Sequence, residues 1–308
     1  MRDTFVNALL NHARTDRNIL LITGDLGFGV LNDFIRDLPA QFINAGVAEQ
    51  NMTGMAAGLA LEGKNVFTYS IANFPTLRCL EQIRNDVVYH NASVNVVAVG
   101  GGFSYGSLGM SHHATEDIAV MRALPGLQVY APCDEVETRA LVAQMIARPA
   151  PTYFRIDKSK VTTSGDKPFE TNRLRQLRSG NDVAILGYGG IVDEALKAAE
   201  QLAVEGVNCS VYSAHTLKPF DSLTLLDLAR TTDVVVTVEE HLPTGGLGSL
   251  AADVFVEAGL LPHRFARISL PDSYSSIVGS QEYLRMRHQI DATGIAMRIR
   301  ALISSHTS

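Results

Sequence analysis

Residues 46–63 read GVAEQNMTGMAAGLALEG, and this stretch decides the fold of the first half of the chain. A short apolar run, Gln41–Asn44, precedes it, and small and apolar side chains follow at helical spacing, so the sequence predicts a strand that turns into a buried helix over Gln50–Glu62. Glu49 stands at the junction. The dipole of a helix favours a carboxylate in its first turn, so Glu49 can be a capping or ion-pairing residue. Ligands of open parallel sheets bind beyond the carboxyl ends of the strands, however, and a half-buried Glu at such an end can hold or share a proton.

Short apolar runs alternate with segments of helical period on both sides of this junction. Nearly continuous apolar strands between helices are typical of parallel sheets with both faces covered, so the sequence predicts an α/β fold with two doubly wound parallel-sheet domains. In the first half we expect strands at Ile19–Thr23, Gln41–Asn44, Val66–Ser70, Val94–Val99, Gln128–Ala131 and Thr152–Ile156, and helices at Thr4–Arg14, Gln50–Glu62, Thr76–His90, Glu116–Ala123 and Glu135–Arg148.

The alternation stops after Asp157, where the chain becomes polar. A polar stretch between periodic segments is typical of a linker or a surface crossing. We therefore expect a first domain at residues 1–160, a linker at 161–180 and a second domain at 181–308. In the second domain we expect strands at Val183–Leu186, Cys209–Ser213, Val234–Glu239 and Arg267–Leu270, and helices at Val192–Glu205, Leu223–Arg230, Leu247–Gly259 and Ile295–Ile303.

The composition argues against several classes of function. A net charge of −6 over 308 residues offers no basic surface for nucleic acid or for an anionic membrane, so we expect neither as a partner. Residues 1–18 carry charges throughout and lack the apolar core of a signal peptide, and no apolar run approaches the ~18 residues of a transmembrane helix. Cys79, Cys133 and Cys209 lie far apart and indicate neither a disulfide framework nor a zinc site. These features favour a cytoplasmic protein.

Residues 99–117, VGGGFSYGSLGMSHHATED, form a glycine-rich segment directly after a predicted strand. The segment matches neither the dinucleotide fingerprint nor the phosphate loop. Its glycines permit tight turns and a close approach of the backbone to a ligand. The pair His112–His113 suggests acid–base work or hydrogen bonds to a polar substrate, although a flexible surface loop with solvated histidines is an equal alternative. No third ligand at a fixed spacing indicates a metal site here.

Aromatic and basic residues at the edges of predicted elements are further candidates. Tyr69 and Phe74 end a strand and lead into a helix, where they either pack in the core or stack on a flat heterocycle. Arg2, Arg78 and Arg155 stand at element edges, where an arginine binds an anion or forms a surface ion pair. The Gly-rich turn in VTVEEHLPTGGLGS, residues 236–249, is better explained by close packing than by anion binding.

These stretches together resemble the transketolase-like enzymes, which use thiamine diphosphate. GVAEQNMTGMAAGLALEG, the aromatic segment after the next strand, the loop ending in SHH, PGLQVYAPCDEVE and PTYFRI occur in the order found in their pyrimidine-binding domain. ILGYGGIVDEALKAA, HTLKPFD, VTVEEH and GGLGS resemble their C-terminal domain. Each motif is short, but their order and spacing make the set specific, and the resemblance covers essentially the whole chain.

One motif of the family is missing from the sequence. The family holds the diphosphate and its divalent metal with GDG followed some distance later by Asn, whereas Gly24–Asp25 and Gly165–Asp166 do not continue as GDG. The resemblance therefore implies the C-terminal half of a split transketolase. A separate N-terminal subunit would carry the GDG motif and hold Mg²⁺ or Ca²⁺, in an α2β2 assembly, and this chain would hold no metal.

The resemblance also implies roles for individual residues. Glu49 would hydrogen-bond N1′ of the cofactor aminopyrimidine and so help the cofactor lose its thiazolium C2 proton, and His112 would hydrogen-bond a substrate hydroxyl. Two positions depart from the usual pattern: Leu108 stands where an Asp is common, and Gly100 where a phosphate-binding His is common. Tyr69, Phe74 and Arg78 would line the pyrimidine pocket, and Arg2, Thr23, His112, His113 and Arg155 would contact the sugar phosphate.

The resemblance predicts transfer of a two-carbon ketol unit from a phosphorylated ketose to an aldose. One alternative is the beta subunit of a 2-oxoacid dehydrogenase decarboxylase component, which shares the architecture and the Glu. A second is an enzyme similar to 1-deoxyxylulose 5-phosphate synthase, which carries both halves on one chain. A non-catalytic scaffold subunit is a third, because a fold alone does not establish an activity.

Overall fold

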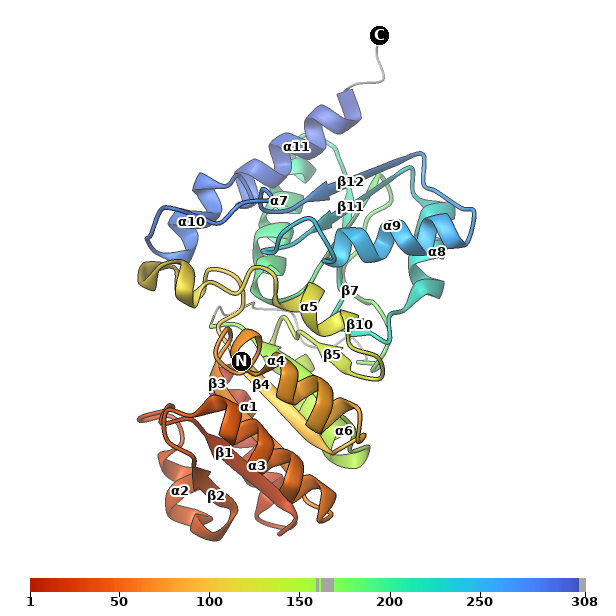
Figure 1. The fold of residues 1–308 in the computed structure, drawn as a ribbon. Helices are drawn as coiled ribbons and strands as arrows, with labels where there is room; N and C mark the ends of the chain where they lie inside the picture. The colour runs from red at the N-terminus through yellow and green to blue at the C-terminus, as the bar shows by residue number, and fades with distance from the viewer. Residues whose placement is uncertain (159–160, 162–168, 305–308) are drawn as a thin grey trace.

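The protein forms two stacked α/β units in a computed structural model that describes residues 1–158, 161 and 169–304. Each unit is a twisted sheet covered by helices, and the units lie end to end with the N-terminus near their junction (Figure 1). Residues 159–160 of the predicted first domain, 162–168 of the predicted linker and 305–308 of the predicted second domain lie outside the described residues. Within the described part, no helix is long and apolar enough to cross a membrane.

The first sheet has seven strands in the order β10-β5-β6-β4-β3-β1-β2. All neighbours pair in parallel except β10 and β5, which are antiparallel. Parallel pairing follows from the apolar runs that alternate with helices, because each helix returns the chain to the same edge. The strands are β1 (Ile19–Thr23), β2 (Phe42–Asn44), β3 (Asn65–Ile71), β4 (Val94–Val99), β5 (Gln128–Tyr130), β6 (Thr152–Ile156) and β10 (Thr216–Lys218).

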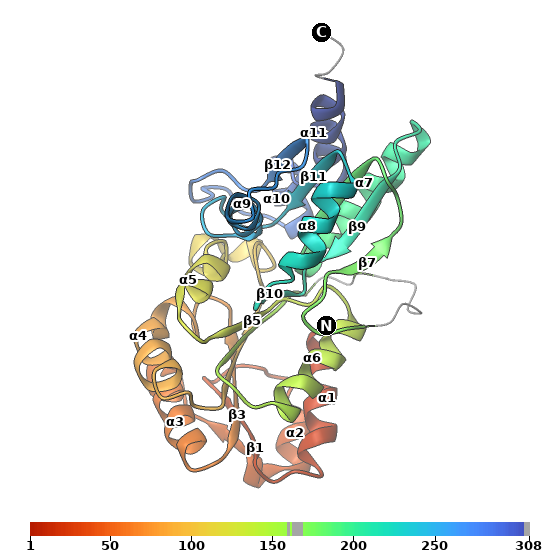
Figure 2. The same ribbon diagram turned by 90° about the vertical axis from the view of Figure 1, so that its right-hand side faces the viewer.

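Helices cover both faces of this sheet, as Figure 2 shows. One face packs on α1 (Arg2–Ala13), α2 (Asn32–Asp37) and α6 (Glu135–Ala147), with Phe5, Phe34 and Leu141 in the shared core. The other face packs on α3 (Glu49–Leu61), the irregular helix Leu77–Val88 and α5 (Asp117–Ala123). The irregular helix consists of the 3₁₀ turn η2 (Leu77–Cys79), α4 (Leu80–Gln82) and the π-helical η3 (Ile83–Val88).

The second sheet has five strands in the order β12-β11-β8-β9-β7, of which only the β7–β9 pair is antiparallel. Helices α7 and α11 cover one face, and α8 and α9 cover the other. The strands are β7 (Arg175–Arg178), β8 (Val183–Gly187), β9 (Cys209–Ser213), β11 (Val234–Val238) and β12 (Arg264–Ile268), and the helices are α7 (Val192–Val204), α8 (Ser222–Thr231), α9 (Leu247–Glu257), α10 (Gln281–Arg287) and α11 (Ala292–Ser304).

The two sheets share one apolar core. Met52 and Ile118 of the first unit belong to the same buried cluster as Leu225, Leu247 and Phe255 of the second. The exchange of strands adds to this contact, because β10 lies after the second unit has begun and yet pairs with β5 of the first sheet. The relative placement of the two units is therefore set by buried surface and by backbone pairing.

The predicted fold class is confirmed, with two parallel-dominated sheets that each carry one antiparallel edge strand. Two predictions of elements need correction. The helix predicted over Thr76–His90 is broken into 3₁₀, α and π segments, and the strand predicted at Arg267–Leu270 lies at Arg264–Ile268. Strand β7 lies within the predicted linker, 161–180, where the polar sequence RQLR forms an edge strand. The bounds of the two domains stay a prediction.

Candidate active site

Glu49 is the first residue of α3, just beyond the carboxyl ends of β1 and β2. Its side chain is 3% exposed. Two glycines let the chain turn into the helix here: Gly46 has a φ of +73°, and a Cβ on Gly24 would lie 3.4 Å from Glu49 Cγ. The structure thus places a buried carboxylate at the sheet edge where ligands of open α/β sheets bind.

A planar cation lies against this carboxylate. Arg78 Nη1 donates to Glu49 Oε2 at 2.8 Å, and the guanidinium carbon lies 4.5 Å from the centre of the Phe74 ring. The edge of the His112 ring contacts Phe74 from another side, with ring centres 5.2 Å apart. Glu49, Phe74, Arg78 and His112 therefore meet at one place, although they come from three separate segments of the chain.

His112 is carried by the glycine-rich loop, residues 100–113, between β4 and α5. The loop is closed at its base by a backbone bridge between Gly102 and Ala114. Asn73 Nδ2 donates to the carbonyl oxygen of His113, which ties the loop to the turn after β3. His112 Nδ1 lies 3.0 Å from Ser111 Oγ, and the ring remains half-buried and within reach of a ligand. These contacts anchor the loop at its base and near His113.

A second group of side chains lies on the opposite flank of His112. The rings of Tyr105 and His112 are 6.4 Å apart, and Lys158 Nζ lies 3.4 Å from the centre of the Tyr105 ring. Burial and the nearby charge of Arg2 lower the pKa of Lys158. Lys158 on the tyrosine ring and the charge of Arg2 nearby make this region positive, which favours an anion. The sequence prediction missed Tyr105 and Lys158.

Gly100 explains why Tyr105 takes this position. A Cβ on Gly100, which has a φ of +97°, would collide with the Tyr105 ring. The small residue therefore lets the tyrosine fold back onto the end of β4.

A sequence signal for Lys158 did exist. This residue comes two positions after β6, at the carboxyl edge of the sheet, where the chain leaves the core.

Arg155, predicted to contact the substrate, is buried in this structure. Its side chain is 2% exposed and lies 3.5 Å from Asp117 and 3.8 Å from Asp157. Burial opposes the charge, but Asp117, Tyr188 and Asp157 hold the pKa of Arg155 well above its usual value. Its guanidinium also lies 5.2 Å from the centre of the Tyr188 ring. Arg155 therefore lies among internal partners between the two units, and its role in binding a substrate stays a prediction.

Three other candidates also have internal partners. Tyr69 is 4% exposed and stacks on Phe5, so the core alternative describes it rather than stacking on a heterocycle. Thr23 Oγ1 lies 3.0 Å from the carbonyl oxygen of Leu26 and 3.2 Å from that of Tyr69 and donates its one hydrogen between them, which braces the turn after β1. The ring of His113 is buried and bonds to the carbonyl oxygen of Gly106. Arg2 lies in the first turn of α1, partly exposed, and pairs with Asp3.

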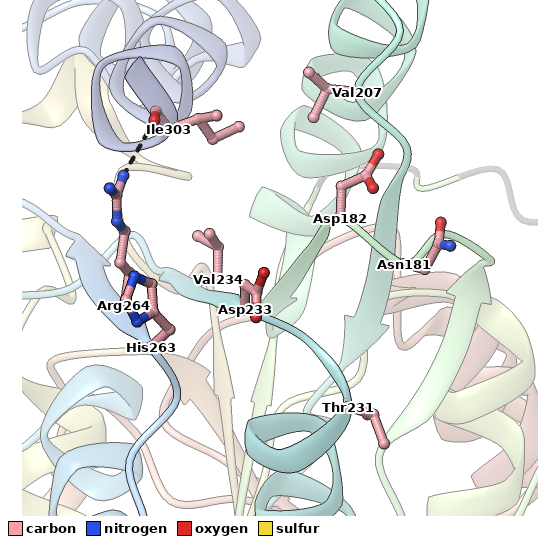
Figure 3. A pocket seen from close by; sticks show the side chains of 9 residues that line it. All are labelled: Asn181, Asp182, Val207, Thr231, Asp233, Val234, His263, Arg264 and Ile303. Atoms are coloured by element: carbon pink, nitrogen blue, oxygen red, sulfur yellow. Dashed lines mark hydrogen bonds between the residues drawn. The ribbon is translucent and has the colours of Figure 1, made fainter. Parts of the chain in front are cut away.

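Two features elsewhere do not belong to this site. Cys133, Asp134 and Glu137 lie close enough to hold an ion, but Arg175 Nη1 already lies 2.7 Å from Asp134 and 3.2 Å from Glu137 and supplies the positive charge. A cavity of about 560 Å³ lies at the amino ends of β8, β11 and β12, the edge opposite to the junction of the two units (Figure 3). Its lining includes Asp182, Asp233 and Arg264, and Arg264 donates to the carbonyl oxygen of Ile303.

Comparison with known proteins gives the family. Residues 1–163 match the model of the transketolase pyrimidine-binding domain, and residues 172–295 match that of the transketolase C-terminal domain. The B subunit of the apulose-4-phosphate transketolase of Phocaeicola vulgatus is 36% identical over 298 residues, which are 96% of this chain and 94% of that protein. The 6-deoxy-6-sulfo-D-fructose transketolase subunit SqwH of a Clostridium species, strain MSTE9, is 37% identical over 96% of this chain and 92% of its own length.

A solved structure agrees with these relatives. It is described as a split gene transketolase, inactive beta4 tetramer, and it superposes with a TM-score of 0.86 and 34% identity over 97% of this chain and 96% of its own. The similarity spans both units over nearly their whole length. The chain therefore belongs to the transketolase family and corresponds to the subunit of a split enzyme that carries the pyrimidine-binding and C-terminal domains.

Proposed function

We propose that this chain supplies Glu49 and the glycine-rich loop to a two-subunit, thiamine-diphosphate-dependent transketolase. The enzyme moves a two-carbon ketol unit from a phosphorylated ketose to an aldose. An N-terminal subunit with the GDG motif completes it as α2β2 and holds the diphosphate through Mg²⁺ or Ca²⁺. The description of the solved relative as an inactive beta4 tetramer supports the need for such a partner. We place the enzyme in the cytoplasm, in keeping with its three free, buried cysteines.

The placement of Arg78 is the observation that carries this proposal. Its guanidinium is planar, stacks on Phe74 at 4.5 Å and donates to Glu49 at 2.8 Å. An aminopyrimidine is also planar, and it can stack on Phe74 and hydrogen-bond to Glu49 in the same way. The residues therefore fit the cofactor, and the guanidinium marks the position that the heterocycle takes once the half-exposed Arg78 side chain swings aside.

The chemistry divides between the cofactor and this chain. Thiamine diphosphate, when bound, supplies the carbanion that accepts the ketol unit. Glu49 holds the proton at the pyrimidine nitrogen, and its burial strengthens that hydrogen bond because little water competes for it. His112 orients a substrate hydroxyl from the rim of the loop and exchanges a proton with it. Phe74 separates these two groups and gives the heterocycle an apolar face.

We assign the charged end of the sugar to Lys158 and Arg2. The named substrates of the two relatives carry a phosphate or a sulfo group, so both have an anion. Lys158 and Arg2 are close enough for the charge of Arg2 to lower the pKa of Lys158, and an anion between them relieves that repulsion. Tyr105 lies between Lys158 and His112, so it sets the distance from the anion to the reacting end of the sugar.

The test is ketol transfer by the chain reconstituted with its N-terminal subunit, thiamine diphosphate and Mg²⁺. Glu49→Gln keeps the shape of the side chain but cannot ionise, so we expect the rate to fall by about 10²-fold or more. Glu62→Gln, at the exposed end of the same helix, is the matched control and should keep the wild-type rate. Decarboxylation of a 2-oxoacid without ketol transfer would instead support the dehydrogenase or deoxyxylulose alternatives. Equal rates for Glu49→Ala and the wild type would support a scaffold.

A further inference from the structure

A side chain of the second unit hydrogen-bonds to the backbone of the glycine-rich loop near the start of the loop. Glu240 follows β11, and its carboxylate is 3% exposed. Oε1 accepts the backbone N–H of Phe103, and Oε2 accepts Arg285 Nε at 2.6 Å. Gln281 Nε2 donates to both oxygens, at 3.0 and 3.2 Å. A carboxylate from one unit thus satisfies a backbone donor in the loop of the other.

The glycines of the loop fit this contact. Gly102 has a φ of +58°, and a Cβ there would lie 2.6 Å from Glu240 Oε1. A Cβ on Gly106 would lie 2.5 Å from Leu284 Cδ1 and 2.7 Å from the carbonyl oxygen of Gly279. Side chains at these two positions would push the loop away from the second unit. Gly102 and Gly106 therefore serve docking onto the protein itself rather than approach to a ligand.

Packing and hydrogen bonds around Phe103 and His113 connect the Glu240 contact to His112. The Phe103 ring stacks on His288, with ring centres 5.3 Å apart, and meets the edge of His113 at 5.0 Å. His113 Nε2 bonds in turn to the carbonyl oxygen of Gly106 at 3.2 Å. The buried side chains of Phe103 and His113 pack against each other beneath the loop. His112, the next residue toward the rim, is left with its ring against Phe74.

We propose that Glu240, held by Arg285 and Gln281, is a positioning residue that fixes the glycine-rich loop and thereby the ring of His112. This role gives the second unit a part in the reaction beyond assembly. The kinetic consequence of the role rests on the proposed function. Glu240 touches neither Glu49 nor Arg78, so we expect the loop, and not these two cofactor-site residues, to move when the Glu240 contact is lost. Sugar turnover depends on Glu240, and cofactor affinity does not.

The first experiment follows hydrogen–deuterium exchange in the reconstituted complex. Glu240→Ala removes the acceptor of the Phe103 N–H, and we expect amides 103–113 to exchange about tenfold faster or more while amides 49–61 of α3 stay unchanged. Glu240→Gln keeps an acceptor oxygen for Phe103 and should recover part of the protection. Arg175→Ala is the matched control. It also breaks buried ion pairs near the junction, those of Arg175 with Asp134 and Glu137, but Arg175 does not touch the loop.

Kinetics of the same variants give the second readout. We expect kcat/KM for the sugars to fall by about 10- to 100-fold in Glu240→Ala, with an unchanged dissociation constant for thiamine diphosphate and partial rescue in Glu240→Gln. Glu240→Met with Arg285→Met removes the pair without leaving a buried charge and should show the same loop-specific loss if Glu240→Ala alone fails to fold.

Three results would overturn the proposal: unchanged exchange in the loop, equal loosening of the loop and α3, or equal kinetic losses in Arg175→Ala. A wild-type complex without ketol transfer would refute the proposed function alone. Loop exchange in Glu240→Ala would still decide the positioning role.

Discussion

Arg78 donates to Glu49 at 2.8 Å while its guanidinium covers the ring of Phe74 at 4.5 Å. One partner is buried and the other is half exposed, with side-chain exposures of 3% and 47%. The half-exposed guanidinium keeps part of its hydration, so water screens this ion pair more than a pair that is buried on both sides. A ligand that competes for Glu49 therefore meets little resistance from Arg78.

Arg78→Met tests whether the guanidinium only occupies the place of the cofactor pyrimidine or contacts the bound cofactor directly. If it stands in, the variant should bind thiamine diphosphate as tightly as the wild type or up to about fivefold more tightly, because the competing ion pair is gone. Calorimetric titration of the reconstituted complex with the cofactor and Mg²⁺ measures this. A tenfold or larger loss of affinity would instead favour a direct contact between Arg78 and the cofactor. Arg84→Met, farther along the same irregular helix, controls for loss of a charge.

Lys158→Met should separate charged from uncharged sugars. Loss of one cation from the Lys158–Arg2 pair removes a charge-assisted contact, so we expect KM for a phosphorylated ketose to rise about tenfold, with little change for its unphosphorylated analogue. Steady-state kinetics with the two sugars measures the ratio. Lys64→Met, near the amino end of β3, is the matched control. Equal effects on both sugars would assign Lys158 a role other than anion binding.

Arg155→Met should affect stability rather than substrate binding. The substitution leaves Asp117 and Asp157 buried without their shared cation, and loss of one partner of a buried pair costs about 3–5 kcal/mol. The midpoint of urea unfolding measures the effect, with Arg139→Met in the exposed pair with Glu135 as the control. A variant of normal stability with a raised KM for the phosphorylated sugar would return Arg155 to the substrate site.

His215 should make stability depend on pH. Burial lowers the pKa of His215, and its ring lies 4.7 Å from that of Phe169. The unfolded chain, with a histidine pKa of about 6.5, then binds more protons than the folded chain just below that pH. The contribution of His215 to stability is therefore full above about pH 6.5 and is lost as the pH falls from there toward the lowered pKa of the folded state.

The measurement is the urea midpoint between about pH 5 and 7.5. His215→Asn should flatten the fall on the acid side relative to the wild type, and the same substitution at the exposed His90 reports the effect of the amino-acid change itself. An unchanged slope in His215→Asn would show that other groups cause the acid sensitivity.

The sequence predicted the strands whose burial is complete. Runs such as Ile19–Thr23, Val94–Val99 and Thr152–Ile156 are apolar along their length, and the structure has strands at these bounds. It missed β7 and β10, because an edge strand needs one apolar side at most and the partner of β10 lies far away in the chain. Long-range pairing of this kind leaves no local pattern.

Only part of the candidate site has a local sequence signature, for a related reason. The junction at Glu49 has a local signature, the turn from a strand into an apolar helix. The roles of Arg155 and Lys158 depend instead on which side of β6 each side chain leaves, and alternation along a strand does not say which side meets the second unit. The structure shows Arg155 buried between the two units and Lys158 where the chain leaves the core, and the proposed roles of the two residues rest on these positions.

The pairing of β10 with β5 makes the two halves of the chain inseparable. A fragment that ends at residue 160 would lack β10 and would leave β5 as an open border of the sheet, which invites association with other chains. Recombination between relatives at the polar segment would need to carry Thr216–Lys218 along with the first domain. The two domain families are recognised separately in the sequence, but in the structure the first sheet is completed by a strand that follows the start of the second domain.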